Sequence, residues 1–269
     1  MPLHRTQVEV LQLLASQRSP DSYLAGGTLS GREGRRYSSD LDIFHSTRDI
    51  TLACFEADRQ VLERNGYTVL PDTVPRPGFV RAIVTAPDGE ALRMDWAHES
   101  SFRFFPVIPD PLTGWQLHWA DAATNKVLAA GGRDKARDAF DILYWNRNPL
   151  SLGALIWAAV GKDAGFSPDL LLDEILRNAR LSPMDLARLR IEGPYDPIEH
   201  AARFRAACRD ARDLIRRLPP ETVGKLFVNE RGEPIEPDPD DPDTLVRTHE
   251  GSNRGCWPTF PIPDDAPSP

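Results

Sequence analysis

Two aspartates separated by one residue, Asp40 and Asp42, open the apolar run DLDIF. Alternate residues of a strand share a face, so a strand here places both carboxylates on one side, about 7 Å apart, and directs Leu41 and Ile43 into the core. Carboxylates this close repel each other, and a divalent cation relieves the repulsion. Mg²⁺ prefers oxygen ligands and is often shared with substrate phosphates. With Asp95 of the segment LRMDWA as a third acid, the pattern predicts a two-metal magnesium site.

Two adjacent glycines, Gly26 and Gly27, precede these acids in the stretch LAGGTLSGREGRRYSSDLDIF. A glycine pair alone usually marks a turn, but the aspartates that follow favour a functional interpretation. Without a Cβ, the backbone can turn sharply and bring its N–H groups to a triphosphate, and a helix beginning at Thr28 would favour anions at its amino end. Arg35 and Arg36 add positive charge for phosphate. The stretch therefore predicts a phosphate cradle beside the metal site.

Secondary-structure elements must position these residues. Along the chain, the predicted strands lie mostly in the first half and the predicted helices mostly in the second. The apolar periodicity predicts strands at residues 23–26, 40–44, 67–70, 78–86 and 90–98, and helices at residues 6–17, 50–65, 121–131, 134–146, 151–163, 168–179, 183–190 and 197–217. The tripeptide PDG between the last two of these strands is a suitable hairpin turn. The predicted fold class is α+β, with a mixed sheet and flanking helices in residues 1–120 and a helical domain in residues 121–231.

The last segment, residues 232–269, is rich in proline and aspartate and poor in apolar residues. Such a segment buries too little surface to offset its ordering entropy, so we expect it to be largely extended or disordered. Trp257 and the glycines of HEGSNRGCWP are the exception. Whether residues 247–261 dock on the body stays open at this level.

Composition limits the possible functions. The chain has 269 residues, a formal net charge of −8 and a sequence pI near 5.3, which argue against a generally basic surface that wraps nucleic acid, so any RNA contact must be local. Three cysteines without a CxxC pair form neither a disulfide framework nor a zinc site. No run approaches eighteen apolar residues. We expect a soluble, cytoplasmic protein with no membrane partner.

The stretch GGTLSGREGRRYSSDLDIF resembles the GG…DxD signature of the polymerase-β-type nucleotidyltransferase superfamily. With the later block NKVLAAGGRDKARDAFDILYW, it is similar to the AbiEii group, which are toxins of type IV toxin–antitoxin systems. The resemblance spans roughly residues 20–146. It implies a polymerase-β-like nucleotidyltransferase core followed by a helical carboxyl-terminal half. The implied activity is Mg²⁺-dependent transfer of a nucleoside monophosphate from an NTP to an acceptor hydroxyl, with loss of pyrophosphate.

The resemblance also implies roles for individual residues. In the manner of that family, Asp40, Asp42 and Asp95 would ligate the metal, and the catalytic set would be Asp40, Asp42, Asp95, Lys126 and Asp141. The nucleotide would be held by Gly26, Gly27, Thr28, Arg36 and Lys126. For the helical residues Lys126, Arg137, Asp138 and Asp141, pairing on a helix surface is the alternative interpretation.

The acceptor and the class of protein stay open. The resemblance implies an RNA acceptor, such as a tRNA end, or a protein side chain, and a cognate antitoxin as a partner. One alternative is a nucleotide-binding partner protein that lacks turnover. Another is a small-molecule transferase of the antibiotic-modifying kind, which shares the first motif but not the RDKARDAFD helix. Release of pyrophosphate from each NTP with Mg²⁺ separates turnover from mere binding.

Overall fold

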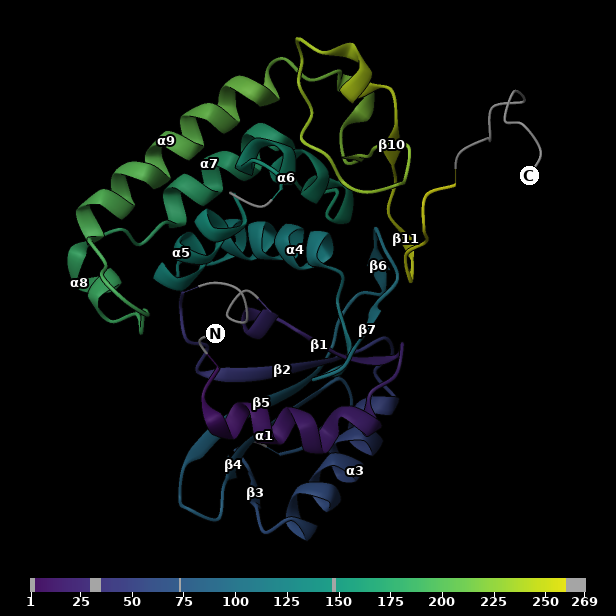
Figure 1. The fold of residues 1–269 in the computed structure, drawn as a ribbon, viewed down its shortest axis with the longest axis vertical. Coiled ribbons are helices and arrows are strands. Elements are labelled where there is room, and N and C mark those ends of the chain that lie inside the picture. The colour runs from purple at the N-terminus through teal and green to yellow at the C-terminus, as the bar shows by residue number, and fades with distance from the viewer. Residues whose placement is uncertain (1–2, 30–34, 73, 147–148, 260–269) are drawn as a thin grey trace.

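The computed structural model describes residues 3–29, 35–72, 74–146 and 149–259. It shows an α+β fold in which a seven-stranded mixed sheet forms the first half and a group of helices packs above it (Figure 1). This agrees with the fold class expected from the sequence. The exact division into domains at residues 120 and 231 stays a prediction.

The sheet has the strand order β3-β4-β5-β2-β1-β8-β7, so β2 is its central strand. Its members are β1 (Ser22–Ala25), β2 (Asp40–His45), β3 (Thr68–Pro71), β4 (Phe79–Thr85), β5 (Ala91–His98), β7 (Ile108–Asp110) and β8 (Gly114–Gln116). The pairs β2–β5 and β1–β8 are parallel and the other neighbours are antiparallel. The helices α1 (Arg5–Leu14) and α3 (Ile50–Arg64) pack on each other, and α3 also packs on β3, β4 and β5.

The helical half consists of α4 (Trp119–Gly132), α5 (Ala136–Trp145), α6 (Leu152–Ala159), α7 (Pro168–Asn178), α8 (Pro183–Ala187) and α9 (Pro197–Ile215). Its centre is α6, whose sequence LGALIWAA has no charged residue and is entirely buried among α4, α7 and α9. Side chains of Ser151, Ser167, Ser182 and Asp196 cap four of these helices, three of which begin with proline. These are the capping patterns that predict the boundaries from sequence.

The proline- and aspartate-rich tail is attached more closely than its composition predicts. Short strands β10 (Thr248–His249) and β11 (Ser252–Asn253) pair with β9 (Leu226–Phe227) and β6 (Phe102–Arg103). The Trp257 ring centroid lies 5.6 Å from that of Phe105. Backbone hydrogen bonds and this aromatic contact therefore replace the missing apolar surface. Residues 260–269 of the predicted tail lie outside the described residues.

The short pieces complete the fold. The 3₁₀ turns are η1 (Ala15–Gln17), η2 (Val160–Lys162), η3 (Pro220–Thr222) and η4 (Pro242–Leu245). Within the described ranges, no helix has both the length and the apolar composition needed to cross a membrane.

Candidate functional site

The register of the central strands brings the three aspartates together. In the parallel pair β2–β5, Asp42 lies directly opposite Asp95, and Asp40 lies opposite Arg93. Leu41 and Ile43, which alternate with the aspartates, are fully buried, as the strand interpretation predicts. Since neighbouring strands are about 4.8 Å apart, the carboxyl groups of Asp42 and Asp95 share one region above the sheet.

These residues line a cavity of about 280 Å³ between the sheet and α4. Of the residues expected at the site from sequence, the cavity is lined by Gly26, Gly27, Arg36, Asp40, Asp42, Asp95 and Lys126. Its other charged lining residues are Arg81, Arg93, Glu99, Arg133 and Arg137. Six cationic and four acidic side chains thus surround one small space, which suits a highly charged anionic ligand with its cation.

Asp42 differs from Asp40 and Asp95, the other two aspartates of this cavity. It forms no ion pair with another described residue. Burial raises the pKa of its carboxyl to about 6, and the charges of Asp40 and Asp95 add to the rise, against the weaker opposing effects of Lys126 and the Gly27 N–H. An additional cation would therefore be stabilised at this carboxylate.

The glycine pair makes room for that carboxylate. Gly26 follows β1 with a φ of +69°, a conformation that favours glycine. A Cβ placed there would lie 2.0 Å from Oδ2 of Asp42. Gly27 is less tightly enclosed, since a Cβ there would be 3.2 Å from a guanidinium nitrogen of Arg36. The GG and DxD motifs are thus in direct contact, although twelve or more residues separate them.

Asp40 and Asp95 each form an ion pair with an arginine of the sheet. Arg81, opposite Asp95 in the β4–β5 register, donates to both of its carboxylate oxygens at 2.8 and 2.6 Å. Arg93 donates to Asp40, and Arg137 from α5 lies 3.5 Å from the same carboxylate. Although burial raises the pKa of the Asp40 carboxyl, these arginines outweigh it and hold the pKa below its usual value.

This site suits a divalent cation because its side chains are oxygen donors and the strand register brings them together. Three carboxylates on adjoining strands, one of them without a cationic partner, are the ligands that Mg²⁺ prefers. As the side chains stand, no cluster of three His, Cys, Asp or Glu in the described chain is arranged to hold a metal. Ligation by all three aspartates therefore requires that Arg81 and Arg93 release Asp95 and Asp40.

Thr28 has a supporting position. It is fully buried and does not line the cavity. Its hydroxyl donates to the main-chain carbonyl of Asp40 at 2.9 Å, and the Ser38 hydroxyl donates to the same carbonyl at 3.0 Å. Residues 27–29 are helical, so the chain turns into a helix directly after the glycines. The contact fixes the start of β2 against this turn.

Acidic side chains of α5 form ion pairs with Lys126 and Arg36. Lys126 Nζ lies 3.1 Å from Asp141 and 3.3 Å from Asp138, and Arg36 donates to both oxygens of Asp141 at 2.7 and 2.9 Å. Burial raises the pKa of Asp141, but Lys126 and Arg36 outweigh it and lower the pKa overall. Asp141 is buried and does not line the cavity. Its contacts orient two cations that do.

Sequence reasoning missed two arginines and an acid. Arg93 precedes Asp95 by two residues on β5, so strand alternation would have indicated that it shares the face of Asp95. Placing Arg81 beside Asp95 requires the β4–β5 register, which the sequence alone does not give. Glu99 follows β5 and lines the cavity, where burial raises the pKa of its carboxyl to about 7 although Lys162 opposes the rise.

Comparisons with known proteins identify the fold. No protein-family model matches the sequence, and no curated protein matches it significantly. Among solved structures, MenT4, a nucleotidyltransferase toxin from Mycobacterium tuberculosis H37Rv, is similar with a TM-score of 0.52 and 18% sequence identity, covering 81% of this chain and 84% of that chain. JHP933 from Helicobacter pylori gives a TM-score of 0.47 and 17% identity over 78% of this chain and 91% of its own. The likeness to MenT4 shows that this chain has a nucleotidyltransferase fold.

Proposed function

We propose that this protein transfers a nucleoside monophosphate from an NTP to an acceptor hydroxyl and releases pyrophosphate. The observation that carries the proposal is the position of Asp42, opposite Asp95 and without a cationic partner, at a cavity rich in arginine and lysine. The nucleotidyltransferase fold supports it. A buried carboxylate pair of this kind is costly unless a cation meets it.

Asp40, Asp42 and Asp95 are the residues that would hold Mg²⁺. When bound, Mg²⁺ supplies positive charge that orients the triphosphate and stabilises the leaving pyrophosphate. The arginines that leave Asp40 and Asp95 remain on the cavity wall, where their guanidinium groups suit phosphate oxygens. Asp95 accepts the proton of the attacking hydroxyl in this proposal.

The triphosphate is bound by groups that α5 has already oriented. Lys126 and Arg36 lie at the cavity with their charged ends fixed by Asp141. Fixing cations before the substrate arrives reduces the ordering cost when phosphate binds and stabilises charge that develops on the leaving group. The turn at Gly26 and Gly27 presents backbone beside Asp42, so the phosphates and the metal ligands share one wall.

The acceptor that we propose is RNA, such as a tRNA end, with a protein side chain as the alternative. The similarity of the fold to that of a toxin and the AbiEii-like motifs support a cytoplasmic toxin of a type IV toxin–antitoxin pair, with a cognate antitoxin as its partner. The acidity of the chain does not oppose an RNA acceptor, because residues 232–269 hold nine Asp and Glu against two Lys and Arg, a net −7 of the total −8.

The test is incubation with each NTP labelled at the α-phosphate, Mg²⁺, and either total RNA or lysate protein. We expect label to enter one acceptor fraction with stoichiometric pyrophosphate release. Asp42→Asn should abolish both, whereas Asp210→Asn, on the exposed surface of α9, should change neither. Nucleotide binding without pyrophosphate release from any NTP would contradict the proposal and favour a binding protein without turnover.

A further inference from the structure

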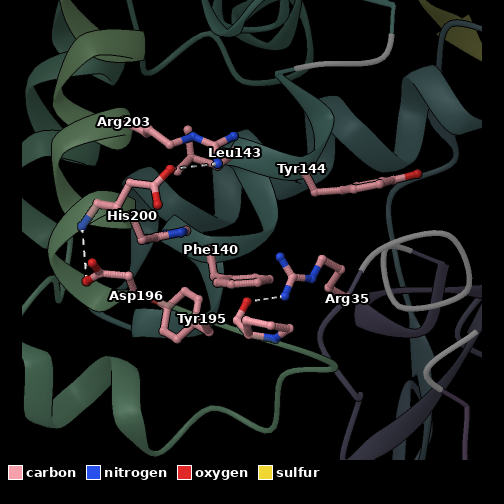
Figure 2. A pocket seen from close by; sticks show the side chains of 10 residues that line it. Arg35, Phe140, Leu143, Tyr144, Tyr195, Asp196, His200 and Arg203 are labelled. Atoms are coloured by element: carbon pink, nitrogen blue, oxygen red, sulfur yellow. Dashed lines mark hydrogen bonds and ion pairs between the residues drawn. The ribbon is translucent and has the colours of Figure 1, made fainter.

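A second cavity, of about 230 Å³, is lined mainly by residues of α5 and α9 (Figure 2). Its walls come from three places: Phe140, Leu143 and Tyr144 of α5, the segment Pro194–Asp196 with Glu199, His200 and Arg203 of α9, and Arg35 of the amino-terminal half. Four of these ten lining residues have aromatic rings: Phe140, Tyr144, Tyr195 and His200. We call it the aromatic pocket.

The aromatic wall of this pocket is already packed. The rings of Phe140 and His200 are stacked, with centroids 4.9 Å apart and planes 10° apart. The Tyr195 ring meets Phe140 edge to face at 5.7 Å. Phe140 itself is buried. A flat ligand entering here meets a preformed platform and little side-chain entropy is lost when it binds.

Two polar atoms of this wall have no hydrogen-bond partner anywhere in the described chain. They are the Tyr195 hydroxyl and Nε2 of His200, and both are buried. Leaving such groups unpaired is destabilising. Burial lowers the pKa of His200 to about 4 and raises the pKa of Tyr195 to about 12, so both side chains are neutral at pH 7. Neutral donors and acceptors next to aromatic faces suit a heterocyclic ring better than a phosphate.

The aromatic pocket and the catalytic cavity share a wall. Arg35 lines the pocket and Arg36 lines the catalytic cavity, while Phe140 lines the pocket and its neighbour Asp141 holds Arg36. Backbone hydrogen bonds from Tyr37 N to Arg190 O and from Glu192 N to Arg35 O fasten this wall to the segment before α9. A chain molecule with one unit in the catalytic cavity therefore has the pocket within reach of a flanking unit.

We propose that the aromatic pocket binds an unpaired nucleobase of an RNA strand, stacked on the Phe140–His200–Tyr195 wall. Single-stranded RNA is recognised in general by aromatic stacking and by hydrogen bonds to base edges. The inference rests on the proposed function, since it places a base of the RNA acceptor beside the reacting nucleotide. Arg35 and Arg203 at the pocket are matched by Asp196 and by Glu199, which lies 3.9 Å from Arg203, so the lining is neutral overall, as suits an uncharged base.

The experiment measures RNA binding without NTP or Mg²⁺, so it does not depend on catalysis. A fluorescein-labelled single-stranded RNA octamer is titrated with the full chain by fluorescence anisotropy. We expect His200→Ala to weaken binding on the order of tenfold, as the loss of one base–aromatic stack does. Tyr195→Phe, which keeps the ring, should weaken it less. Tyr67→Ala, at a different cavity beside α1, is the matched control and should bind as wild type does.

A set of octamers with one abasic position completes the test. Removing the base that occupies the pocket should weaken binding to wild type but cause no further loss in His200→Ala. Equal binding of wild type and all pocket variants, each shown to be folded by its melting curve, would overturn the proposal. Competition by free mononucleotides as strong as by the octamer would overturn it too, because the occupant would then be a free nucleotide.

The proposed function and this inference fail separately. If no NTP is turned over but the abasic effect holds, the nucleotidyl-transfer proposal fails and the base-binding site stands. If label is transferred but the pocket variants bind RNA normally, the reverse is true.

Discussion

The two cavities lined by residues of α5 differ in how their polar groups are paired. In the catalytic cavity Asp40 and Asp95 form ion pairs with arginines, whereas Asp42 and Glu99 form none with a described residue. In the aromatic pocket the rings pack on one another, and two neutral polar atoms have no hydrogen-bond partner among the described residues. The missing partner therefore indicates the ligand: a cation in the first cavity, and the edge of a heterocycle in the second.

A single helix produces this difference. On α5, Asp138 and Asp141 contact Lys126, and Phe140 stacks on His200 of α9. Successive residues of a helix point about 100° apart, so the neighbours Phe140 and Asp141 enter different environments. Changes at the charged face should alter phosphate and metal binding, and they should leave the aromatic pocket unaffected.

The largest effect is expected from Asp42→Asn. Removing this carboxylate eliminates a metal ligand, so transfer should fall by about a thousandfold or more, as loss of transition-state charge stabilisation does. The variant should fold and be slightly more stable, because repulsion with Asp40 and Asp95 is relieved. Label transfer and a melting curve measure both. Turnover close to wild type in Mg²⁺ would show that Asp42 is not a ligand, and the comparison of the two cavities would fail.

A smaller loss is expected from Lys126→Ala. A charge-assisted contact to phosphate is worth about 1.5–3 kcal/mol, so kcat/KM for the NTP should fall roughly ten- to a hundredfold. The fold should survive, because Asp141 keeps Arg36 and Asp138 keeps Arg133 at 2.7 Å. An unchanged kcat/KM would mean that Lys126 only supports α5.

The sequence predicted the parts of the site that depend on local periodicity. Strand alternation placed Asp40 and Asp42 on one face, and serine–proline pairs located the starts of α7 and α8. It did not predict contacts that depend on register or on long-range packing. The Arg81–Asp95 pair follows from the β4–β5 register, and Arg36 meets Asp141 across 105 residues. Two-residue strands such as β10 and β11 carry no periodic signal, so the sequence left the docking of residues 247–261 open.

A pH-dependent effect on stability is expected from Glu99→Gln. Burial raises the folded-state pKa of Glu99 from 4.5 to about 7, so the folded protein binds this proton more tightly than the unfolded chain. The carboxyl is protonated in both states below about pH 4.5 and ionised in both above about pH 7. Ionisation in the folded state therefore destabilises wild type progressively between these values, by about 3 kcal/mol at most.

The measurement is the difference in melting temperature between Glu99→Gln and wild type across pH 4 to 8.5. It should be near zero at pH 4 and should rise to several degrees in favour of the variant at pH 8.5. Glu221→Gln, an exposed control in η3, should show no such trend. A constant difference across this range would show that Glu99 is not buried as an acid beside the charged cavity.

The smallest effect, and the one that tests the pairing of charges in the catalytic cavity most directly, is expected from Arg81→Gln. Arg81 competes with a divalent cation for Asp95, and its bidentate pair is about one-third exposed on the arginine side. Partly exposed pairs are worth about 1 kcal/mol or less, so the variant should bind Mn²⁺ or Mg²⁺ a few-fold more tightly than wild type, as measured by calorimetric titration without nucleotide. Arg64→Gln, at the exposed end of α3, removes the same charge away from the cavity and should have no effect. Weaker metal binding in Arg81→Gln would mean that the guanidinium holds Asp95 in place for the metal, and tighter binding means that the metal must displace it.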